Sequence, residues 1–227
     1  MIRMSRRIYR MLEPGIVYPY DSTVFLVEQS THLSLIDTGT GLPGVYTYIV
    51  QGIHVLGLDV KPVRRVYNTH CHINNAGGDW AFHRYNGSTV AVHIGDAESV
   101  RNGDPDKTGA RELGVNFKPT PVGLEIRGSS GVLEQDFVDI SFIHTPGHTP
   151  GSVSYIVQDE LRTIALIGDA LGSLKKSWGS SVDDWYDSVD KVGKLEADIY
   201  CTSVKCYTKN EFRVYLDRVL SEGPIWM

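Results

Sequence analysis

The sequence has few cysteines, no long hydrophobic run and no excess of positive charge. Three cysteines among 227 residues (Cys71, Cys201 and Cys206) form no paired framework, and an odd count favours a reducing compartment. No stretch approaches the roughly 18 apolar residues of a membrane span. The basic opening at residues 3–10 is not followed by the apolar segment of a secretion signal. We therefore expect a cytoplasmic protein without a membrane partner.

The charge balance argues against a nucleic-acid partner. The 22 Lys and Arg residues against 27 Asp and Glu give a net charge of −5, and no run of like charge is long. Non-specific nucleic-acid binding needs a basic face that neutralises phosphates. At this length, one large domain can bury a sizeable core without disulfides or a structural metal. We expect a small-molecule substrate, and the sequence leaves the oligomeric state open.

Strand-like and helical segments alternate along the chain. β-Branched and aromatic runs predict strands at residues 23–27, 33–36, 63–67, 90–92, 137–143, 152–157, 163–167 and 199–201. Length and apolar spacing predict helices at residues 45–56, 75–85, 182–196 and 211–220. Strands grouped among helices in this way predict an α/β fold with two layers of sheet and helices outside them.

One segment interrupts this alternation. Residues 95–121 are rich in Gly, Pro, Asp and Asn, and residues 103–106 (GDPD) form the strongest helix and strand breaker. Apolar strands resume soon afterwards, so the segment does not divide the chain. We predict a single domain over residues 1–227 with a loop insertion at residues 95–130, which would form a wall of any pocket.

Residues 69–78, with the sequence THCHINNAGG, carry the strongest chemical signal. Two histidines at i and i+2 reach one point only from extended or looped backbone, and imidazole is the commonest metal ligand among side chains. A further histidine, His148, lies in the tight loop TPGHTPGS at residues 145–152. Three imidazoles and a water are what a catalytic Zn²⁺ requires. An isolated histidine is more often a surface or core residue, but these three together favour a metal.

Four motifs in order, each at the end of a predicted strand, resemble the metallo-β-lactamase superfamily. They are LIDTG at residues 35–39, THCHINNAGG at 69–78, TPGHTPGS at 145–152 and IGDA at 167–170. The resemblance, to a metallohydrolase fold like that of glyoxalase II, covers most of the chain. It implies a four-layer αβ/βα sandwich of two mixed β-sheets, with helices on the outer faces, and a metal-dependent hydrolase.

The resemblance also assigns candidate site residues by position. His70, His72 and His148 match the three histidines of the family's first metal position. Asp169 matches the aspartate that bridges two metals, and it would act here as a ligand or a base. Asp37 matches an aspartate near the first motif that orients a ligand histidine. In a D-T-G turn, Asp37 could equally cap local backbone N–H groups. We take Asp169 and Asp37 as the candidate catalytic residues.

The second metal position of the family is missing from this sequence. Asn74 and Asn75 replace its aspartate and histidine, and Val204 aligns with its last histidine. An amide oxygen is a poor Zn²⁺ ligand, and an amide does not serve as a general base. We predict one metal ion, Zn²⁺, with iron as the alternative. Thiolates of Cys201 and Cys206 could build a substitute site, but small buried side chains are the favoured reading.

Three functions are compatible with half of a dinuclear site. The first is a mononuclear hydrolase in which a metal-activated water cleaves an ester, thioester, lactone or amide. The second resembles the persulfide dioxygenases of the superfamily, with iron on His70, His148 and Asp169. The third is a non-catalytic binding protein whose active site has decayed. A nuclease fits worst, because it needs two metals and a basic surface.

Two further groups of residues bear on the substrate. Aromatic side chains could line a pocket or pack in the core, and the candidates are Tyr85, Phe117, Trp178, Trp185 and Tyr186. Lys175 and Lys176, after the IGDA motif, could attract a carboxylate or a phosphate group. A solvated edge is the favoured interpretation of these two lysines.

Overall fold

Two β-sheets form the centre of the molecule. The computed structural model describes residues 1–227. The first sheet has seven strands in sequence order: β1 (Ile2–Arg3), β2 (Ile8–Leu12), β3 (Val24–Glu28), β4 (Leu33–Ile36), β5 (Val63–Tyr67), β6 (Thr89–His93) and β7 (Val122–Ile126). The second has six strands in the order β13 (Cys206–Thr208), β12 (Ile199–Thr202), β11 (Thr163–Gly168), β10 (Val153–Gln158), β9 (Asp139–His144) and β8 (Ser130–Glu134).

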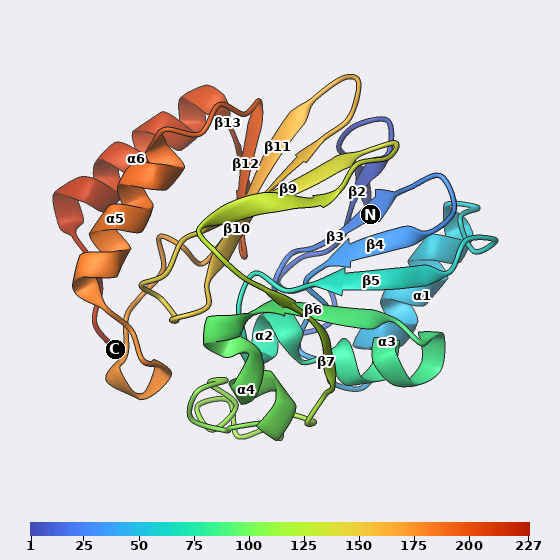
Figure 1. The fold of residues 1–227 in the computed structure, drawn as a ribbon, viewed down its shortest axis with the longest axis horizontal. Coiled ribbons are helices and arrows are strands. Elements are labelled where there is room, and N and C mark those ends of the chain that lie inside the picture. Colours follow the sequence, from blue (N-terminus) through green and yellow to red (C-terminus); the bar gives the residue numbers. More distant parts are fainter.

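Helices cover the two outer faces of this pair of sheets (Figure 1). Those on the first sheet are α1 (Val45–Val55), α2 (Ile73–Ala76), α3 (Asp79–Asn86) and α4 (Ile94–Asn102). Those on the second sheet are α5 (Val182–Gly193) and α6 (Lys209–Glu222). A short 3₁₀ turn, η1 (Lys176–Trp178), precedes α5. The arrangement confirms the predicted four-layer αβ/βα sandwich of two mixed sheets.

Three separate apolar layers hold the sandwich together. The cluster between the first sheet and its helices includes Leu26 and Ile49, and the one between the sheets includes Phe25 and Tyr155. A third cluster, around Trp185, joins the second sheet to α5 and α6. Phe25 and Leu26 point to opposite layers because successive side chains of a strand alternate between its faces. Each sheet is therefore covered on one face by the other sheet and on its opposite face by helices.

The predicted strands and helices are mostly present, but several strands were not predicted and one predicted helix is divided in two. The sequence did not predict β1, β2, β7, β8 or β13. In β2 the basic residues at the chain start obscured the strand, although four of its five residues are buried. The helix predicted at residues 75–85 is divided into α2 and α3 at Gly77 and Gly78. A Cβ on Gly77 would lie 2.2 Å from the carbonyl oxygen of Thr40, so this glycine lets the D-T-G loop pack on the helix end.

The segment at residues 95–130, expected to be a loop, is partly regular. It contains most of α4, all of β7 and the start of β8, and β7 pairs in parallel with β6. Irregular backbone is confined mainly to residues 103–121. The polar composition concealed the elements because α4 is a short helix and β7 is an edge strand, half exposed to solvent.

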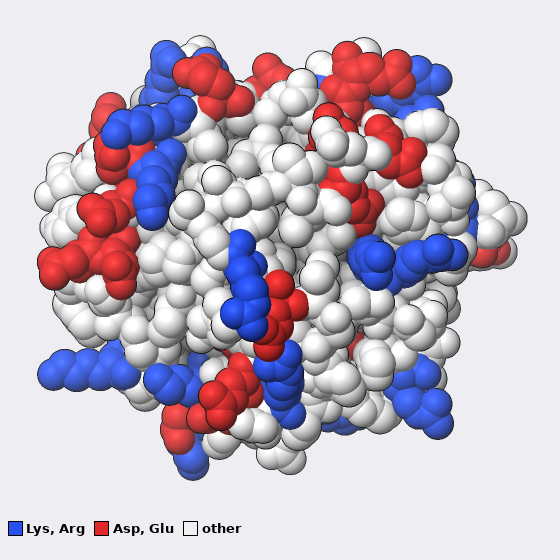
Figure 2. Space-filling model, viewed as in Figure 1, with Lys and Arg blue, Asp and Glu red and all other residues white.

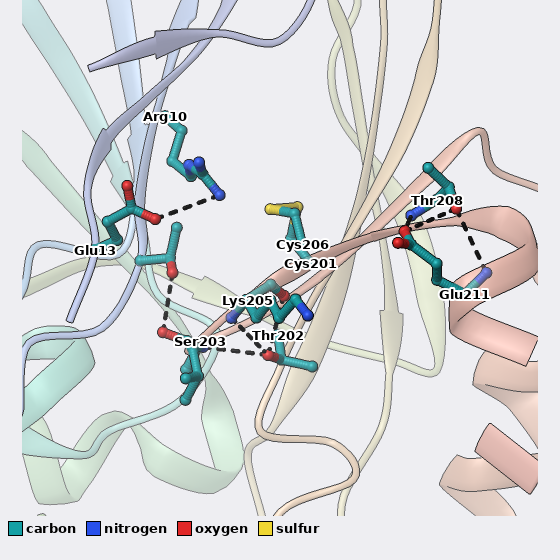
Figure 3. The surroundings of a disulfide bond; sticks show 11 residues. Arg10, Glu13, Cys201, Thr202, Ser203, Lys205, Cys206, Thr208 and Glu211 are labelled. Carbon is teal, nitrogen blue, oxygen red and sulfur yellow. Dashed lines mark hydrogen bonds and ion pairs between the residues drawn. A yellow bond between two sulfur atoms is a disulfide. The ribbon is translucent and has the colours of Figure 1, made fainter. Parts of the chain in front are cut away.

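The cysteines also differ from the prediction. Cys201 on β12 and Cys206 on β13 form a disulfide (Figure 3). Cys71 is free and buried. The two bonded cysteines are opposite each other in the antiparallel pair, so pairing followed from strand register, which the sequence did not reveal. The expectation of three unpaired cysteines is wrong, and the argument from them for a reducing compartment loses its basis. The disulfide also removes both thiolates as metal ligands.

Surface charge is mixed on the face drawn in Figure 2. Lys and Arg side chains there lie among Asp and Glu side chains and form no continuous basic area. None of the helices has the length and apolar character that crossing a membrane requires.

Candidate metal centre

The candidate ligands lie where several strands end at one edge of the sandwich. His70 and His72 follow β5, His148 lies between β9 and β10, and Asp169 directly follows β11. Gly168 has a φ of 52°, and a Cβ there would lie 2.7 Å from Cβ of Thr69. A side chain at this position would therefore push the Asp169 loop away from the histidine loop. Glycine lets the two sheets meet closely at the site.

Three histidine nitrogens converge on one point. Nδ1 of His72 lies 3.1 Å from Nε2 of His70 and 2.9 Å from Nε2 of His148. All three side chains are buried, and one nitrogen of each lies within 4.8 Å of the other two, close enough to hold a metal ion together. Ligands of a tetrahedral Zn²⁺, each about 2.0–2.1 Å from the ion, lie roughly 3.3 Å apart. The spacing therefore fits one metal ion with these three ligands.

The hydrogen bonds behind the ring nitrogens support this geometry. Nδ1 of His148 donates to the carbonyl oxygen of Ser173 at 2.6 Å, so the Nε2 of a neutral His148 carries a lone pair. Nδ1 of His70 lies 3.1 Å from Oγ1 of Thr69, and that hydroxyl lies 2.9 Å from a carboxylate oxygen of Asp37. The hydroxyl donates to Asp37 and accepts from His70, which leaves a lone pair on Nε2 of His70 as well. Both of these nitrogens lie within hydrogen-bonding distance of Nδ1 of His72, and a shared cation would stabilise this arrangement.

The rings of His70 and His72 are held in the neutral form that binds metal. Burial, together with the neighbouring ring of His148, lowers the pKa of His70 and of His72 well below the ordinary value. A metal needs an unprotonated nitrogen, so these surroundings keep the ligands ready at neutral pH. The residues present fit a metal ion.

Asp169 is the carboxylate closest to the cluster. Its Oδ2 lies 3.6 Å from Nε2 of His70 and 3.7 Å from Nε2 of His148. Its side chain is 22% exposed, more than those of the histidines, and it lines the same cavity as His72 and His148. It is therefore placed either to complete the coordination or to accept a proton in the cavity.

Asp37 acts on the site from behind. It is buried, does not line the cavity, and contacts no histidine directly. Its carboxylate accepts from the backbone N–H of Thr69 at 2.8 Å and from the amide of Asn75 at 2.8 Å. Burial raises its pKa to about 7 against the lowering effect of these hydrogen bonds. The hydrogen bonds that connect Asp37 through Thr69 to His70 are the arrangement in which a carboxylate would orient a ligand histidine.

The residues at the family's second metal position lie in different surroundings. The amide nitrogen of Asn75 is buried and donates to Asp37, to Oγ1 of Thr69 at 3.3 Å and to Oγ of Ser203 at 3.0 Å. Asn74 and Val204 line the cavity, and Val204 is 64% exposed. Ser203, next to Val204, also lines the cavity and in addition contacts Asn75. Asn75 forms hydrogen bonds where the family would coordinate a metal.

Cys71 is directed away from the site. It is buried in the apolar cluster under the helices, and its Sγ lies 3.4 Å from the carbonyl oxygen of Lys107. This direction agrees with the alternation expected of an extended segment between two histidines. Its backbone N–H donates to the carboxylate of Asp96 at 2.9 Å.

Asp96 is a residue of the site that the sequence did not predict. Besides Cys71, it accepts from Oγ1 of Thr149 at 2.7 Å and from the backbone N–H of Gly151 at 2.8 Å. It therefore ties the loop of His70 and His72 to the loop of His148. Burial raises its pKa, while these hydrogen bonds oppose the rise. The only signal in the sequence is an acid in the first turn of α4, which is common.

A cavity of about 360 Å³ opens in front of the histidines. Among the five aromatic candidates, only Trp178 lines it; its ring centre lies 4.4 Å from that of His72 and 5.2 Å from that of His148. Tyr20 and Met227 contribute apolar surface on other sides, and Glu112 is a lining carboxylate. The prediction that the segment after residue 95 supplies a wall holds for Thr108, Gly109, Glu112 and Leu113.

Solved structures with the same arrangement of elements are metallo-β-lactamases. A B3 enzyme described as having an active-site glutamic acid aligns with a TM-score of 0.78 at 22% identity, over 98% of this chain and 89% of that one. An enzyme from Cronobacter sakazakii with an HARLDQ motif gives 0.75 at 20% identity, over 89% and 79%. A class B3 di-zinc enzyme from an Alaskan soil metagenome gives 0.78 at 18% identity, over 97% and 90%. At these identities the likeness shows the fold.

Sequence relatives and a family model complete the comparison. A probable metallo-hydrolase of Methanocaldococcus jannaschii is 28% identical over 146 residues, which are 64% of this chain and 67% of the relative. The uncharacterized protein YobT of Bacillus subtilis is 28% identical over 153 residues, 64% of this chain and 60% of YobT. The model of the metallo-beta-lactamase superfamily matches residues 17–204, a range that includes every candidate ligand. Fold, ligand geometry and sequence agree, and the chain belongs to the metallo-β-lactamase superfamily.

Proposed function

We propose that the protein is a mononuclear metallohydrolase that cleaves an ester, thioester, lactone or amide. The observation that carries the proposal is the asymmetry of the site. Three histidine nitrogens converge within hydrogen-bonding distance, whereas the neighbouring position holds the hydrogen-bonded amide of Asn75. Zn²⁺ on three histidines would supply Lewis-acid activation of water and of a carbonyl group.

The chain's own residues supply the remainder of the chemistry. Oδ2 of Asp169 lies beside two of the ligand nitrogens and faces the cavity, where it accepts a proton from the attacking water. Trp178 packs edge-on against two ligand rings and shields them from solvent. Asp37 and Thr69 fix the orientation of His70. The iron alternative omits His72, yet Nδ1 of His72 lies as close to both partners as a ligand would.

Metal content tests the proposal directly. Protein purified without chelator should contain about one zinc per chain, because only one ligand set is complete. A content well below one would contradict the metal site, and two metals per chain would contradict the mononuclear state.

Hydrolysis provides the second test. The zinc-loaded protein should cleave activated esters or thioesters, and a His70→Ala, His148→Ala double variant should lose this turnover. Equal turnover by the two proteins would favour a non-catalytic relative. Oxygen consumption with glutathione persulfide on the iron-loaded protein would favour the dioxygenase.

A further inference from the structure

The cavity in front of the histidines is lined by acids and by no free cation. Its lining includes the carboxylates of Asp21, Glu112 and Asp169, and no Lys or Arg. Asp21 is engaged with the backbone, since it accepts from the N–H groups of Thr40 and Tyr18, both at 2.9 Å. Asp169 faces the histidines. Glu112 is therefore the carboxylate of the lining that is placed to act on a substrate group away from the metal.

Glu112 forms an ion pair with Lys175 beside the cavity. Nζ of Lys175 forms an ion pair with Oε1 of Glu112, and each side chain is 27% exposed. Although burial alone would raise it, the hydrogen bond and the charge of Lys175 lower the pKa of Glu112 below its ordinary value. Nζ of Lys175 also lies 5.5 Å from the ring centre of Trp178, close to the cavity wall. Without Glu112, this ammonium group would be available to a carboxylate in the cavity.

Glu112 also lies close to the metal ligands. The point where a Cβ on Gly109 would lie is 3.7 Å from Cδ2 of His72, 3.7 Å from Nε1 of Trp178 and 3.9 Å from Oε2 of Glu112. These three groups therefore surround one small space in the cavity wall. Nε1 of Trp178 is a buried N–H donor with no partner at hydrogen-bond distance; the carboxylate of Glu112 lies near it, and this contact helps to lower the pKa of Glu112. An acceptor oxygen of a bound molecule would satisfy it, as buried polar groups require.

We infer that the part of the substrate next to Glu112 is uncharged and carries a hydrogen-bond acceptor, and that Glu112 is the residue that rejects anionic substrates. This inference rests on the proposed function and adds the substrate class to it. Oε2 of Glu112, the oxygen that does not pair with Lys175, repels an anionic group, and Lys175 is already occupied. An uncharged acyl group is not repelled by Glu112 and does not need a free cation. Its carbonyl oxygen can accept a hydrogen bond from Nε1 of Trp178.

Two matched metal-binding ligands test the inference by calorimetry on the zinc-loaded protein. Butyrohydroxamic acid is uncharged at its far end, and succinic monohydroxamic acid carries a carboxylate there. The wild type should bind the uncharged ligand about tenfold more tightly, which corresponds to about 1.4 kcal/mol. Glu112→Gln should tighten binding of the anionic ligand and bring the ratio close to one. Binding of the uncharged ligand should change less than twofold.

Control variants separate the charge at Glu112 from the general effect of removing an acid. Asp106 forms an equivalent pair with Arg111 outside the cavity, so Asp106→Asn should leave both affinities unchanged. Lys175→Met should increase the preference for the uncharged ligand. Equal wild-type affinities, or the same response of Glu112→Gln and Asp106→Asn, would overturn the inference while leaving the hydrolase proposal intact. Binding of neither hydroxamate would overturn the metal site, and with it both proposals.

Discussion

Asn75 shows how one amide changes the chemistry available to the site. An imidazole at this position offers a lone pair to a metal, whereas the Asn75 amide nitrogen offers two protons and donates to Asp37, Thr69 and Ser203. The donated hydrogen bonds join the end of β4 to the hairpin after β12 without an ion. The side chain therefore replaces the connection a second metal would make, but not its Lewis acidity.

Asp96 should be essential for the metal centre although it does not face the cavity. Asp96→Ala leaves the backbone N–H groups of Cys71 and Gly151 buried without acceptors, at a cost of about 1–3 kcal/mol each. With the two histidine loops no longer tied, zinc affinity should fall about tenfold or more. Competition with a chromophoric chelator measures this affinity. The exposed Glu98→Ala on the same helix is the control, and equal affinity of the two variants would refute the role of Asp96.

Asp79 should make stability depend on pH. Burial raises its pKa from 3.8 to about 8, although Asn68 and Thr38 donate to the carboxylate and oppose the rise. Because the pKa is higher in the folded state, the folded protein retains a proton that the unfolded chain releases. This contribution to stability is full below pH 4 and is lost as pH rises through about 8.

Asp79→Asn should therefore reduce the loss of folding stability that accompanies a rise in pH. Urea unfolding of the metal-free protein at pH 5, 6, 7 and 8 should show a smaller loss in the variant than in the wild type. Part of the decline should remain, since the raised pKa of Asp37 acts in the same direction. The exposed Asp217→Asn on α6 should follow the wild-type curve. A variant curve parallel to that of the wild type would mean that Asp79 is ionised throughout.

Short elements deliver the site residues from both sheets. The hairpin formed by β12 and β13 is an example, since its turn supplies Ser203 and Val204 to the cavity. The carbonyl oxygen of Ser203 also accepts from Oγ1 of Thr23 at 3.0 Å. The disulfide between Cys201 and Cys206 joins the two strands next to the turn of this hairpin. A strand pair this short has few hydrogen bonds, so the covalent link limits its opening.

Reduction of the disulfide should destabilise the protein measurably. Closing a loop between cysteines five positions apart is worth about 2 kcal/mol by the chain-entropy relation. Dithiothreitol should therefore lower the unfolding midpoint of the wild type. A Cys201→Ala, Cys206→Ala double variant should start lower and not respond to the reductant. Thiol titration of the non-reduced, denatured wild type should find one thiol, from Cys71; three thiols would show that the disulfide is absent.

At the scale of the whole molecule, the site joins the two halves of the sandwich. His70 and His72 lie in a loop after β5 of the first sheet, whereas His148 and Asp169 lie in loops after β9 and β11 of the second. An ion held by these residues binds the folded arrangement and not the unfolded chain. It should therefore stabilise the packing of the sheets against each other.

Zinc removal should lower the stability of the whole domain. With free zinc at 100 times the dissociation constant, binding adds about 2.7 kcal/mol to the free energy of unfolding. Thermal unfolding with zinc and after chelator treatment should show this difference as a shift of the midpoint. The His70→Ala, His148→Ala double variant should unfold at the same temperature in both conditions. An equal shift in this variant would place the stabilising metal elsewhere.

The sequence by itself determined the family, the four-layer fold and the grouping of the candidate ligands. The family and the candidate ligands can be predicted because each motif is a short run of neighbouring residues at the end of a strand, such as the two histidines of residues 69–78. The strands at residues 33–36 and 63–67 were predicted with their observed bounds because their β-branched or apolar content is local information.

Only the tertiary structure decided how the remaining side chains pair. The bond of Asn75 to Ser203 spans 128 positions, and the ion pair of Glu112 with Lys175 spans 63. The disulfide depended on the register of β12 and β13, and the role of Asp96 depended on the meeting of two distant loops. No local pattern encodes such contacts, since each partner alone resembles an ordinary surface or loop residue. The candidate metal ligands could thus be predicted from the sequence. The side chains that surround the metal position are known only from the packing of the two sheets.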